Sequence, residues 1–405
     1  MPTLRRAMRG LVEEAGRRVP FYRAHWAGTD LRALEFPRDW TRLPLVRKHD
    51  LLAAGVEARL DERCERESLV SETTSGSSGQ PFEMLLSRSS VRRRRMRFLR
   101  ALLAAGYRPG ERLMLVAARH STPPVARLLG WTYAGLEQGE AALAAEYRRV
   151  RPRVLYGPLS TLLALADRLA GDPQGWHRPR LVVTTAEELT PAARRALERT
   201  YGERIADFYG MTELGLVAWR AAAGGPYRAP SRQLYMEFLP CAEDAALERL
   251  VISDLAGGAM PLIRYETGDL VHRDRSLPGT SIVRFVGREV DCLRLPGGLR
   301  LSPYRVTTSI EVIEGVEQYQ VVQNADLSLE IVVRSSATRA EPVLESVRRA
   351  VNHVCDGALP LKVKLASEPI EPLAGKLRPV RSLARDQSEN SVLDIRVPPD
   401  RGRRR

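Results

Sequence analysis

The chain has 405 residues, of which 44% are hydrophobic, and its formal net charge at pH 7 is +14. This length exceeds the usual size of one compact core, so we expect two domains of unequal size. No uninterrupted apolar run approaches the roughly 20 residues that cross a bilayer, and the first residues lack the apolar stretch of a secretory signal. We therefore expect a cytoplasmic protein without a membrane partner.

The cysteines do not form a metal or disulfide pattern. Cys64, Cys241, Cys292 and Cys355 lie far apart, with no CxxC pair, and no HExxH arrangement occurs. This spacing argues against a structural zinc site and against a disulfide framework. Cys292 is either a redox-sensitive thiol or a small packed residue, and we favour the packed residue.

The positive charge raises nucleic acid as a partner. Most of it is arginine spread through Ala- and Leu-rich segments, with one block at residues 92–95 and a terminal RGRRR. No aromatic residues of the kind that stack on bases are interleaved with these arginines. We therefore favour a solvated helix face for the block over a nucleic-acid surface. A field that attracts polyanionic small molecules is a third interpretation.

The N-terminal third predicts helices followed by a strand. Helical patterns fill the first 70 residues and are interrupted at three prolines, Pro20, Pro37 and Pro44. A longer helix is expected at about 90–105, because its apolar residues recur at helical spacing, and an apolar strand at 113–117.

Strands and helices alternate between residues 150 and 215. Three strands, at 154–156, 181–185 and 205–208, are separated by helices at 159–169 and 191–201. Alternation of this kind predicts a parallel sheet covered by helices, in which ligands bind beyond the carboxyl ends of the strands. Two of these strand ends carry the strings TTAEE (184–188) and YGMTELG (209–215).

The remainder of the chain predicts a β-rich region and then a small α+β domain. LVISDL, LIRYETGDL and SIVRFVGR follow one another from residue 250, and later come strands at 318–323 and 329–334, a helix at 341–355 and a strand in LKVKLA. The predicted fold is α/β, with a large N-terminal domain of parallel-rich sheets and a β-rich subdomain, plus a small mobile α+β C-terminal domain. The expected boundaries are 1–287 and 288–386, with a flexible basic tail at 387–405.

The string TTSGSSGQP at 73–81 combines hydroxyls with glycines. Such a segment can wrap phosphate oxygens with backbone N–H and hydroxyl donors, although it lacks the lysine of the GxxxxGK[ST] loop. A flexible Ser/Gly linker is the alternative. The string closely resembles the phosphate-binding loop TSG[ST][ST]GxP of the adenylate-forming superfamily, which includes acyl-CoA synthetases, luciferases and peptide-synthetase adenylation domains. The matching residues are Thr74, Ser75, Gly76, Ser77, Ser78, Gly79 and Pro81.

Further strings of this superfamily follow in order. The segment resembling its adenine- and phosphate-binding turn is YGMTE, namely Tyr209, Gly210, Met211, Thr212 and Glu213. The resemblance implies that Tyr209 lies against adenine, that Thr212 meets the α-phosphate and that Glu213 helps to bind Mg²⁺. An aromatic face suits a purine and a hard cation takes carboxylate oxygen. A capped turn with a solvated Glu213 is the alternative.

Three later positions complete the resemblance. YETGDL places Asp269 where the family holds the ribose hydroxyls, and GREVDC supplies Arg288 as a nucleotide contact and Asp291 at the hinge. LAGKLRPV presents Lys376, which resembles the catalytic lysine of the C-terminal domain. Taken alone, Lys376 would more often be a surface lysine.

Within the superfamily the chain most resembles phenylacetate–CoA ligases and their relatives, in VPFYRAHW, LPLVRKHDL (43–51) and TTAEELT. There the TTAEE position borders the nucleotide, which implies contacts from Ala186 and Glu187; Thr185 replaces the family's glycine. The implied acyl pocket lies near Tyr156, Gly157 and Pro158.

The resemblance implies ATP-dependent activation of a carboxylic acid, aromatic or arylacetic, to an acyl-adenylate, with Mg²⁺ as cofactor and coenzyme A as the thiol acceptor. LRLPGGLRLSP departs from the relatives' loop that lines the thiol tunnel. An amine or a carrier protein is therefore an alternative acceptor, and a homodimer is left open. The alternative from another class is a non-catalytic, basic, nucleic-acid-binding relative.

Overall fold

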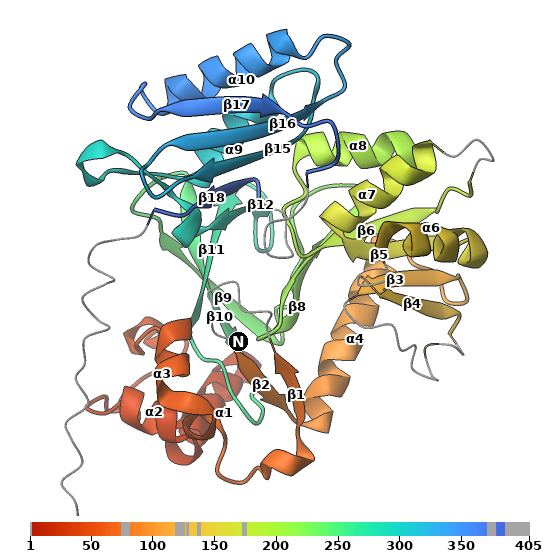
Figure 1. Cartoon of the computed structure of the whole chain (residues 1–405). Helices are drawn as coiled ribbons and strands as arrows, with labels where there is room; N and C mark the ends of the chain where they lie inside the picture. The colour runs from red at the N-terminus through yellow and green to blue at the C-terminus, as the bar shows by residue number, and fades with distance from the viewer. Residues whose placement is uncertain are drawn as a thin grey trace, which may run out of the picture.

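The computed structural model describes residues 2–73, 82–117, 126, 129–135, 139–171, 176–370 and 378–384. Figure 1 shows a large lobe and a small lobe, formed by the C-terminal elements drawn in blue-green to blue, which lies across the ends of the large lobe's sheets. No helix in these described ranges is both long enough and apolar enough to span a bilayer.

The first helices pack on the large lobe and break where the prolines predict. They are α1 (Pro2–Arg18), α2 (Pro20–His25) and α3 (Lys48–Arg59). Tyr22 of α2 is 1% exposed, and its hydroxyl donates to the carbonyl of Pro261 at 3.0 Å. This bond ties the helices to the β-rich part of the lobe.

A short hairpin of β1 (Val70–Thr73) and β2 (Glu83–Leu86) leads into α4 (Arg88–Ala105). The hydroxyl of Ser87 caps the first turn of α4, and Gly106, in the left-handed conformation at φ 109°, ends it. The predicted helix is thus confirmed and begins two residues earlier than expected.

The main sheet has six strands in the order β4-β3-β5-β6-β7-β8 among the described residues. Its strands are β3 (Leu113–Ala117), β4 (Trp131–Gly135), β5 (Val154–Pro158), β6 (Leu181–Thr185), β7 (Ile205–Met211) and β8 (Gly215–Arg220). All pairings are parallel except that of β7 with β8. The predicted parallel sheet is confirmed, while β4 and β8 were not anticipated.

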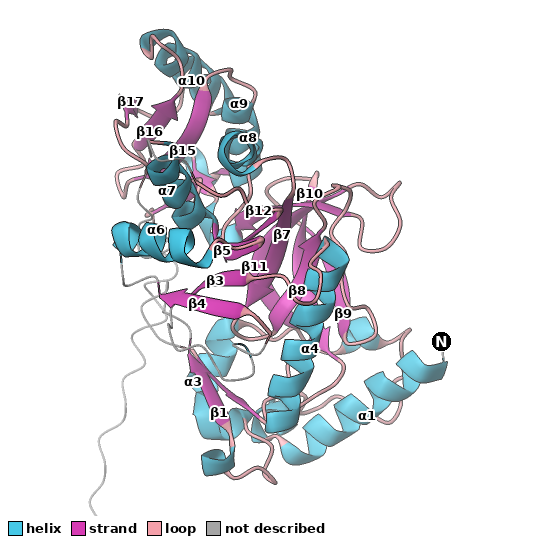
Figure 2. Cartoon of the chain, turned by 90° about the vertical axis from the view of Figure 1, so that its right-hand side faces the viewer, coloured by secondary structure: helices cyan, strands magenta, loops and turns pink. Residues whose placement is uncertain are grey.

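Helices cover both faces of this sheet. α6 (Gly139–Val150), α7 (Leu159–Ala170) and α8 (Pro191–Tyr201) share one hydrophobic core with it, and α4 packs on the opposite face (Figures 1 and 2). α8 starts as predicted, because the hydroxyl of Thr190 accepts a hydrogen bond from the N–H of Ala193 at 3.2 Å.

The β-rich part is an antiparallel sheet in the order β12-β11-β10-β9. Its strands are β9 (Leu234–Pro240), β10 (Leu247–Asp254), β11 (Tyr265–Arg273) and β12 (Ile282–Arg288). The sequence predicted strands from residue 250 onward; β9 was missed, and the region starts earlier than expected.

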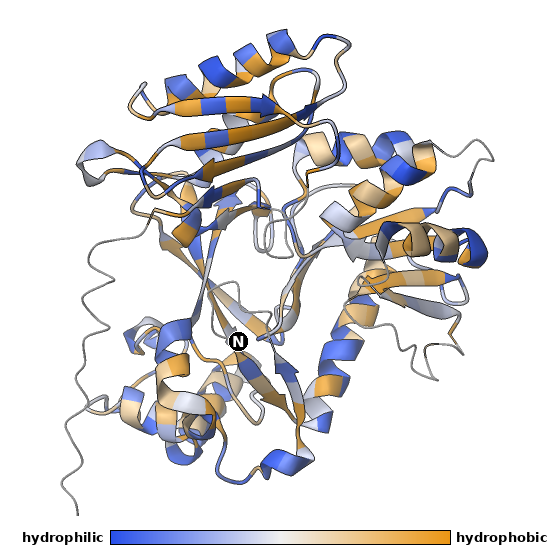
Figure 3. Cartoon of the chain, viewed as in Figure 1, coloured by the Kyte–Doolittle hydropathy of each residue, from blue (hydrophilic) through white to orange (hydrophobic). Residues whose placement is uncertain are grey.

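The small lobe packs helices on a sheet of order β17-β16-β15-β18. It contains β13 (Leu293–Arg294), β14 (Arg300–Leu301), α9 (Pro303–Glu311), β15 (Val316–Gln323), β16 (Leu329–Ser335), α10 (Glu341–Val354), β17 (Leu361–Leu365) and β18 (Val380–Ser382). α10 mixes hydrophobic and hydrophilic residues (Figure 3) and buries Val343, Leu344, Val347 and Val351. The expected domain boundary at 287/288 stays a prediction, and the expected tail at 387–405 lies outside the described residues.

Candidate functional site

A cavity of about 490 Å³ lies where β7, β11 and β12 end beneath the small lobe. Most of its walls come from the turn after β6, the end of β7 with the turn that follows it, β11, β12 and the segment that enters β18. Lys48, Pro191, Arg194, Arg220, Tyr227 and Asp291 also line it. Ten of the residues predicted from sequence line it, namely Ala186, Glu187, Tyr209, Gly210, Met211, Thr212, Glu213, Asp269, Arg288 and Asp291. Segments more than 100 residues apart in the sequence therefore meet around one space.

Tyr209 and Asp269 form a connected pair within the cavity. The Tyr209 ring stacks on Phe285 with centroids 3.7 Å apart, and its hydroxyl donates to the Asp269 carboxylate. Arg288 Nε lies 3.5 Å from Asp269 Oδ1 on the other side. Burial, followed by the charge of Asp269, raises the pKa of Tyr209 well above its ordinary value, so Tyr209 stays a neutral donor. The arrangement offers a flat aromatic surface next to a fixed carboxylate.

The turn between β7 and β8 presents Glu213. Its side chain is 8% exposed, and Oε1 lies 3.5 Å from Lys48 Nζ and 3.4 Å from the hydroxyl of Tyr265. The hairpin is so close at its start that a Cβ on Gly210 would lie 2.9 Å from the carbonyl oxygen of Gly215. Glycine at 210 is thus required for this turn.

The side chains around Glu213 show what kind of Mg²⁺ site this part of the cavity could form. Within the described part of the chain no group of three or more His, Cys, Asp or Glu side chains comes together as a metal cage. A single buried carboxylate fits an ion that arrives with phosphate oxygens and keeps most of its ligands from them. Lys48, in the LPLVRKHDL string, was given no role from sequence.

The turn after β6 carries Thr185, at the position where the resemblance implies a glycine. The hydroxyl of Thr185 donates to the carbonyl of Phe208 on β7 at 3.0 Å, and the next residue, Ala186, has a left-handed backbone at φ 70°. The Glu187 carboxylate accepts from the N–H and the hydroxyl of Ser160 at 2.7 and 2.8 Å, at the start of α7. Glu187 therefore anchors the turn to α7.

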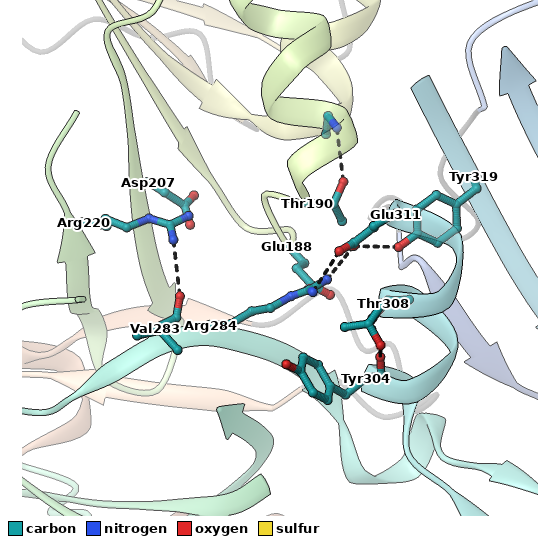
Figure 4. Close-up of polar contacts among 12 residues, drawn as sticks. Glu188, Thr190, Asp207, Arg220, Val283, Arg284, Tyr304, Thr308, Glu311 and Tyr319 are labelled. Carbon is teal, nitrogen blue, oxygen red and sulfur yellow. Dashed lines mark hydrogen bonds and ion pairs between the residues drawn. The ribbon is translucent and has the colours of Figure 1, made fainter. Parts of the chain in front are cut away.

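A buried cluster joins this turn to the small lobe (Figure 4). Arg284 of β12 donates to Glu188 and, through two bonds of 2.6 and 2.9 Å, to Glu311 of α9. Glu311 also accepts from the hydroxyl of Tyr319 at 2.8 Å. We call Glu188, Arg284, Glu311 and Tyr319 the inter-lobe cluster.

The charges of the inter-lobe cluster are perturbed by burial. Burial raises the pKa of Glu188 to about 7, although Arg284 acts in the opposite direction. Burial also opposes the charge of Arg284, but Glu188 and Glu311 outweigh it and raise the pKa of Arg284 above its ordinary value. Arg284 thus stays cationic. No sequence pattern pointed to this cluster.

Asp207 is a second carboxylate that the sequence did not single out. It is 4% exposed, lines the cavity, and accepts from Thr184 at 2.6 Å and from the hydroxyl of Tyr227. Burial raises its pKa, with both hydrogen bonds opposing the shift. The sequence feature that could have identified Asp207 is its place in β7, two residues before Tyr209 of the YGMTE string.

Asp291 lies in the short connection from β12 to β13. It is 3% exposed and pairs with Arg378 at 3.1 and 3.2 Å. Arg378 precedes β18, and both it and Asp291 line the cavity. The predicted hinge position is therefore held to the segment that follows Lys376 in sequence.

The remaining predicted residues fall in two groups. Tyr156, Gly157 and Pro158, at the end of β5, are not among the residues that line this cavity; Tyr156 packs edge-on against Phe98 and Phe208. Their assignment to an acyl pocket stays a prediction. Residues 74–79 and Lys376 lie outside the described residues.

Known proteins match the chain over most of its length. A phenylacetate–coenzyme A ligase of Pseudomonas putida is 26% identical over 351 residues, which cover 78% of this chain and 76% of that protein. One of Thermus thermophilus is 27% identical over 355 residues, covering 80% and 78%. No protein-family model matches the chain.

Solved structures share the fold. A 2-hydroxyisobutyryl-CoA ligase in the postadenylation state, bound to R3-HIB-AMP, matches with a TM-score of 0.76 and 18% identity, over 96% of this chain and 90% of that chain. The same ligase in the thioesterification state matches with a TM-score of 0.60 and 18% identity, over 96% and 91%.

These matches confirm the resemblance predicted from the motifs: the chain is similar in sequence to phenylacetate–coenzyme A ligases and has the fold of the acyl-CoA ligases of the adenylate-forming superfamily.

Proposed function

We propose that this chain is an AMP-forming acid–thiol ligase that converts a carboxylic acid to its acyl-adenylate with ATP and then transfers the acyl group to the thiol of coenzyme A. One observation carries the proposal: ten residues predicted from separate strings line one cavity of about 490 Å³. The sequence similarity to two phenylacetate–coenzyme A ligases supports the reaction class.

In the first step a carboxylate oxygen of the acid bonds to the α-phosphorus of ATP, and the bond to the pyrophosphate leaving group breaks. The stacked Tyr209–Phe285 pair offers a surface for adenine, and Asp269 can accept two ribose hydroxyls. Thr212 is assigned to the α-phosphate. Mg²⁺, held by Glu213 and phosphate oxygens, would supply positive charge to the phosphates. These residues act by positioning and electrostatic stabilisation.

In the second step the thiol loses its proton to solvent and its sulfur bonds to the acyl carbon, and AMP leaves with the electron pair of the broken acyl–phosphate bond. By resemblance, residues 288–386 turn about Asp291 between the steps, and Lys376 serves only the first. Asp291 is held by Arg378, two residues after Lys376 in sequence, which supports a hinge that is linked to the lysine's segment.

The acid is proposed to be aromatic or arylacetic, because both sequence relatives are named for phenylacetate. The deciding experiment is carboxylate-dependent exchange of pyrophosphate with ATP, run over aryl, arylacetic, amino-aryl and aliphatic acids. Coenzyme A, an amine and a carrier protein are then compared as acceptors of the accumulated adenylate. Absence of exchange with every acid would refute the proposal.

Lys376 supplies a separate test of the mechanism. Lys376→Ala is expected to slow adenylate formation by roughly 100-fold or more, as for loss of a major charge-stabilising donor. If Lys376→Ala kept full adenylation and lost only thiol transfer, the lysine's assigned role would be wrong. The cytoplasmic location and the homodimer considered from sequence stay predictions.

A further inference from the structure

The arginine block of α4 does not form one solvated face. Arg92 and Arg95 are exposed, but the Arg94 side chain is only 13% exposed and points into the large lobe. Arg97, one turn later, is 4% exposed. α4 packs against β8 (Figure 2), so these inward side chains reach the turn between β7 and β8.

Arg94 and Arg97 hold the backbone of that turn. Arg94 donates to the carbonyls of Thr212 at 2.8 Å and Glu213 at 2.5 Å, and Arg97 donates to the carbonyl of Leu214 at 2.6 Å. Three successive carbonyls are thus fixed by guanidinium groups from a helix on the other side of the hairpin. Charge-assisted hydrogen bonds of this kind are stronger than neutral ones.

Arg94 makes a third contact that reaches another segment. Its Nη1 also donates to Glu72 Oε2 at 2.8 Å. Glu72 lies in β1, two residues before the segment at 74–81 that the sequence assigns to phosphate binding. One guanidinium therefore joins the strand that leads into the assigned phosphate loop to the turn that carries Thr212 and Glu213.

The geometry requires an arginine. A planar guanidinium presents several donors in fixed directions, whereas a lysine ammonium cannot reach three oxygens arranged around a plane in the same way. The arginine stem is also packed, since a Cβ on Gly215, which has φ 69°, would lie 3.2 Å from Arg94 Cδ. Both the guanidinium group and the stem of Arg94 therefore fit closely against the turn.

We infer that Arg94 is a positioning residue for adenylation, which fixes the Thr212–Glu213 turn against β1 so that Thr212 and Glu213 address one Mg²⁺-bound triphosphate. The inference rests on the proposed function and adds a residue that touches neither ATP nor the acid. Arg94 acts through Glu72 and through the backbone of the turn.

The test compares Arg94→Gln and Arg94→Lys with Arg92→Gln, an exposed neighbour in the same block. MgATP affinity is measured by titration calorimetry, and carboxylate-dependent pyrophosphate exchange is measured over a range of MgATP and of free Mg²⁺.

Because small misplacements of reacting groups lower rates by up to about 100-fold, Arg94→Gln is expected to lower kcat/KM for MgATP by roughly 10- to 100-fold and to raise the Mg²⁺ concentration for half-maximal rate. Arg94→Lys should fall between Arg94→Gln and wild type, and it remains informative if Arg94→Gln does not fold. Arg92→Gln should stay within about 2-fold of wild type, as for a surface substitution.

The outcomes distinguish the positioning role of Arg94 from the proposed ligase function. If the Arg94 variants bind MgATP and respond to Mg²⁺ as Arg92→Gln does, the inference is overturned even when the exchange reaction is present. If the Arg94 variants alone lose MgATP affinity while no acid supports exchange, positioning is supported and the proposed function fails. A merely structural role would lower the melting temperature and leave the Mg²⁺ dependence of the folded protein unchanged, which also overturns the inference.

Discussion

Removal of Arg284 should destabilise the contact between the two lobes more than any exposed ion pair would. Its guanidinium is shared by Glu188 and Glu311, whose side chains are 7% and 5% exposed. Arg284→Gln would leave both carboxylates buried without a cation, and breaking a buried pair in this way costs about 3–5 kcal/mol. The 2.8 Å bond from Tyr319 to Glu311 is present with or without Arg284, so it does not offset this loss.

The assay is denaturant unfolding followed by two signals. All five tryptophans lie in the sequence before residue 288, so tryptophan fluorescence reports on the large lobe, while far-ultraviolet circular dichroism reports on both. Arg284→Gln is expected to lower the stability by about 3–5 kcal/mol and to separate the two transitions, because the small lobe loses its buried anchor.

Arg275→Gln is the matched control. Arg275 also pairs with a carboxylate, Glu248, at 2.5 Å, but its side chain is 76% exposed. Exposed pairs contribute about 0–1 kcal/mol, so this variant should unfold almost as wild type does. Equal stability losses in Arg284→Gln and Arg275→Gln would refute the reasoning, as would coincident transitions in both.

Two further predictions concern titrating groups. Glu188 has a pKa of 4.5 in the unfolded chain and about 7 in the folded one, so the folded state binds the extra proton in this interval and stability falls as pH rises through it, by about 3 kcal/mol. Glu188→Gln removes this loss and leaves the neighbouring Arg284, Glu311 and Asp207 in place. When the free energy of unfolding is measured from pH 5 to 8, the stability of the variant relative to wild type should increase with pH. Parallel curves for the two proteins would contradict it. For the cysteines, burial raises the pKa of Cys292 to about 12 and that of Cys355 to about 11. Iodoacetamide at pH 8 should therefore modify the half-buried Cys64 first, as read by mass spectrometry. Early labelling of Cys292, which is 2% exposed, would contradict this prediction.

The regular elements near the motifs could be predicted because local chemistry determines them. Thr190 and Pro191 mark the start of α8, and the apolar strings of β3 and β6 read as buried strands. The segments missed have weaker local signals. β4 is a five-residue edge strand containing Gly135, and α9 contains β-branched residues that favour strands when considered alone.

The sequence predicted the site residues that lie in the motif strings, and it did not predict those outside them. The inward direction of Arg94 had a signal, since positions 94, 97, 101 and 105 recur at helical spacing and lead into the buried stripe of α4. Four arginines in a row obscure that spacing. The inter-lobe cluster has no such signal, because Glu188 and Arg284 are 96 residues apart and only the folded chain brings them together.

The left-handed backbone of Ala186 has a consequence for how the turn meets a ligand. An alanine at φ 70° is disfavoured by about 1–2 kcal/mol relative to a right-handed or extended backbone, a cost that glycine would avoid. Glycine, however, would also sample several other shapes, whereas alanine held between Thr185 and Glu187 keeps one. The entropic cost of ordering the turn is therefore met during folding, and it does not reduce the affinity for a ligand that binds there.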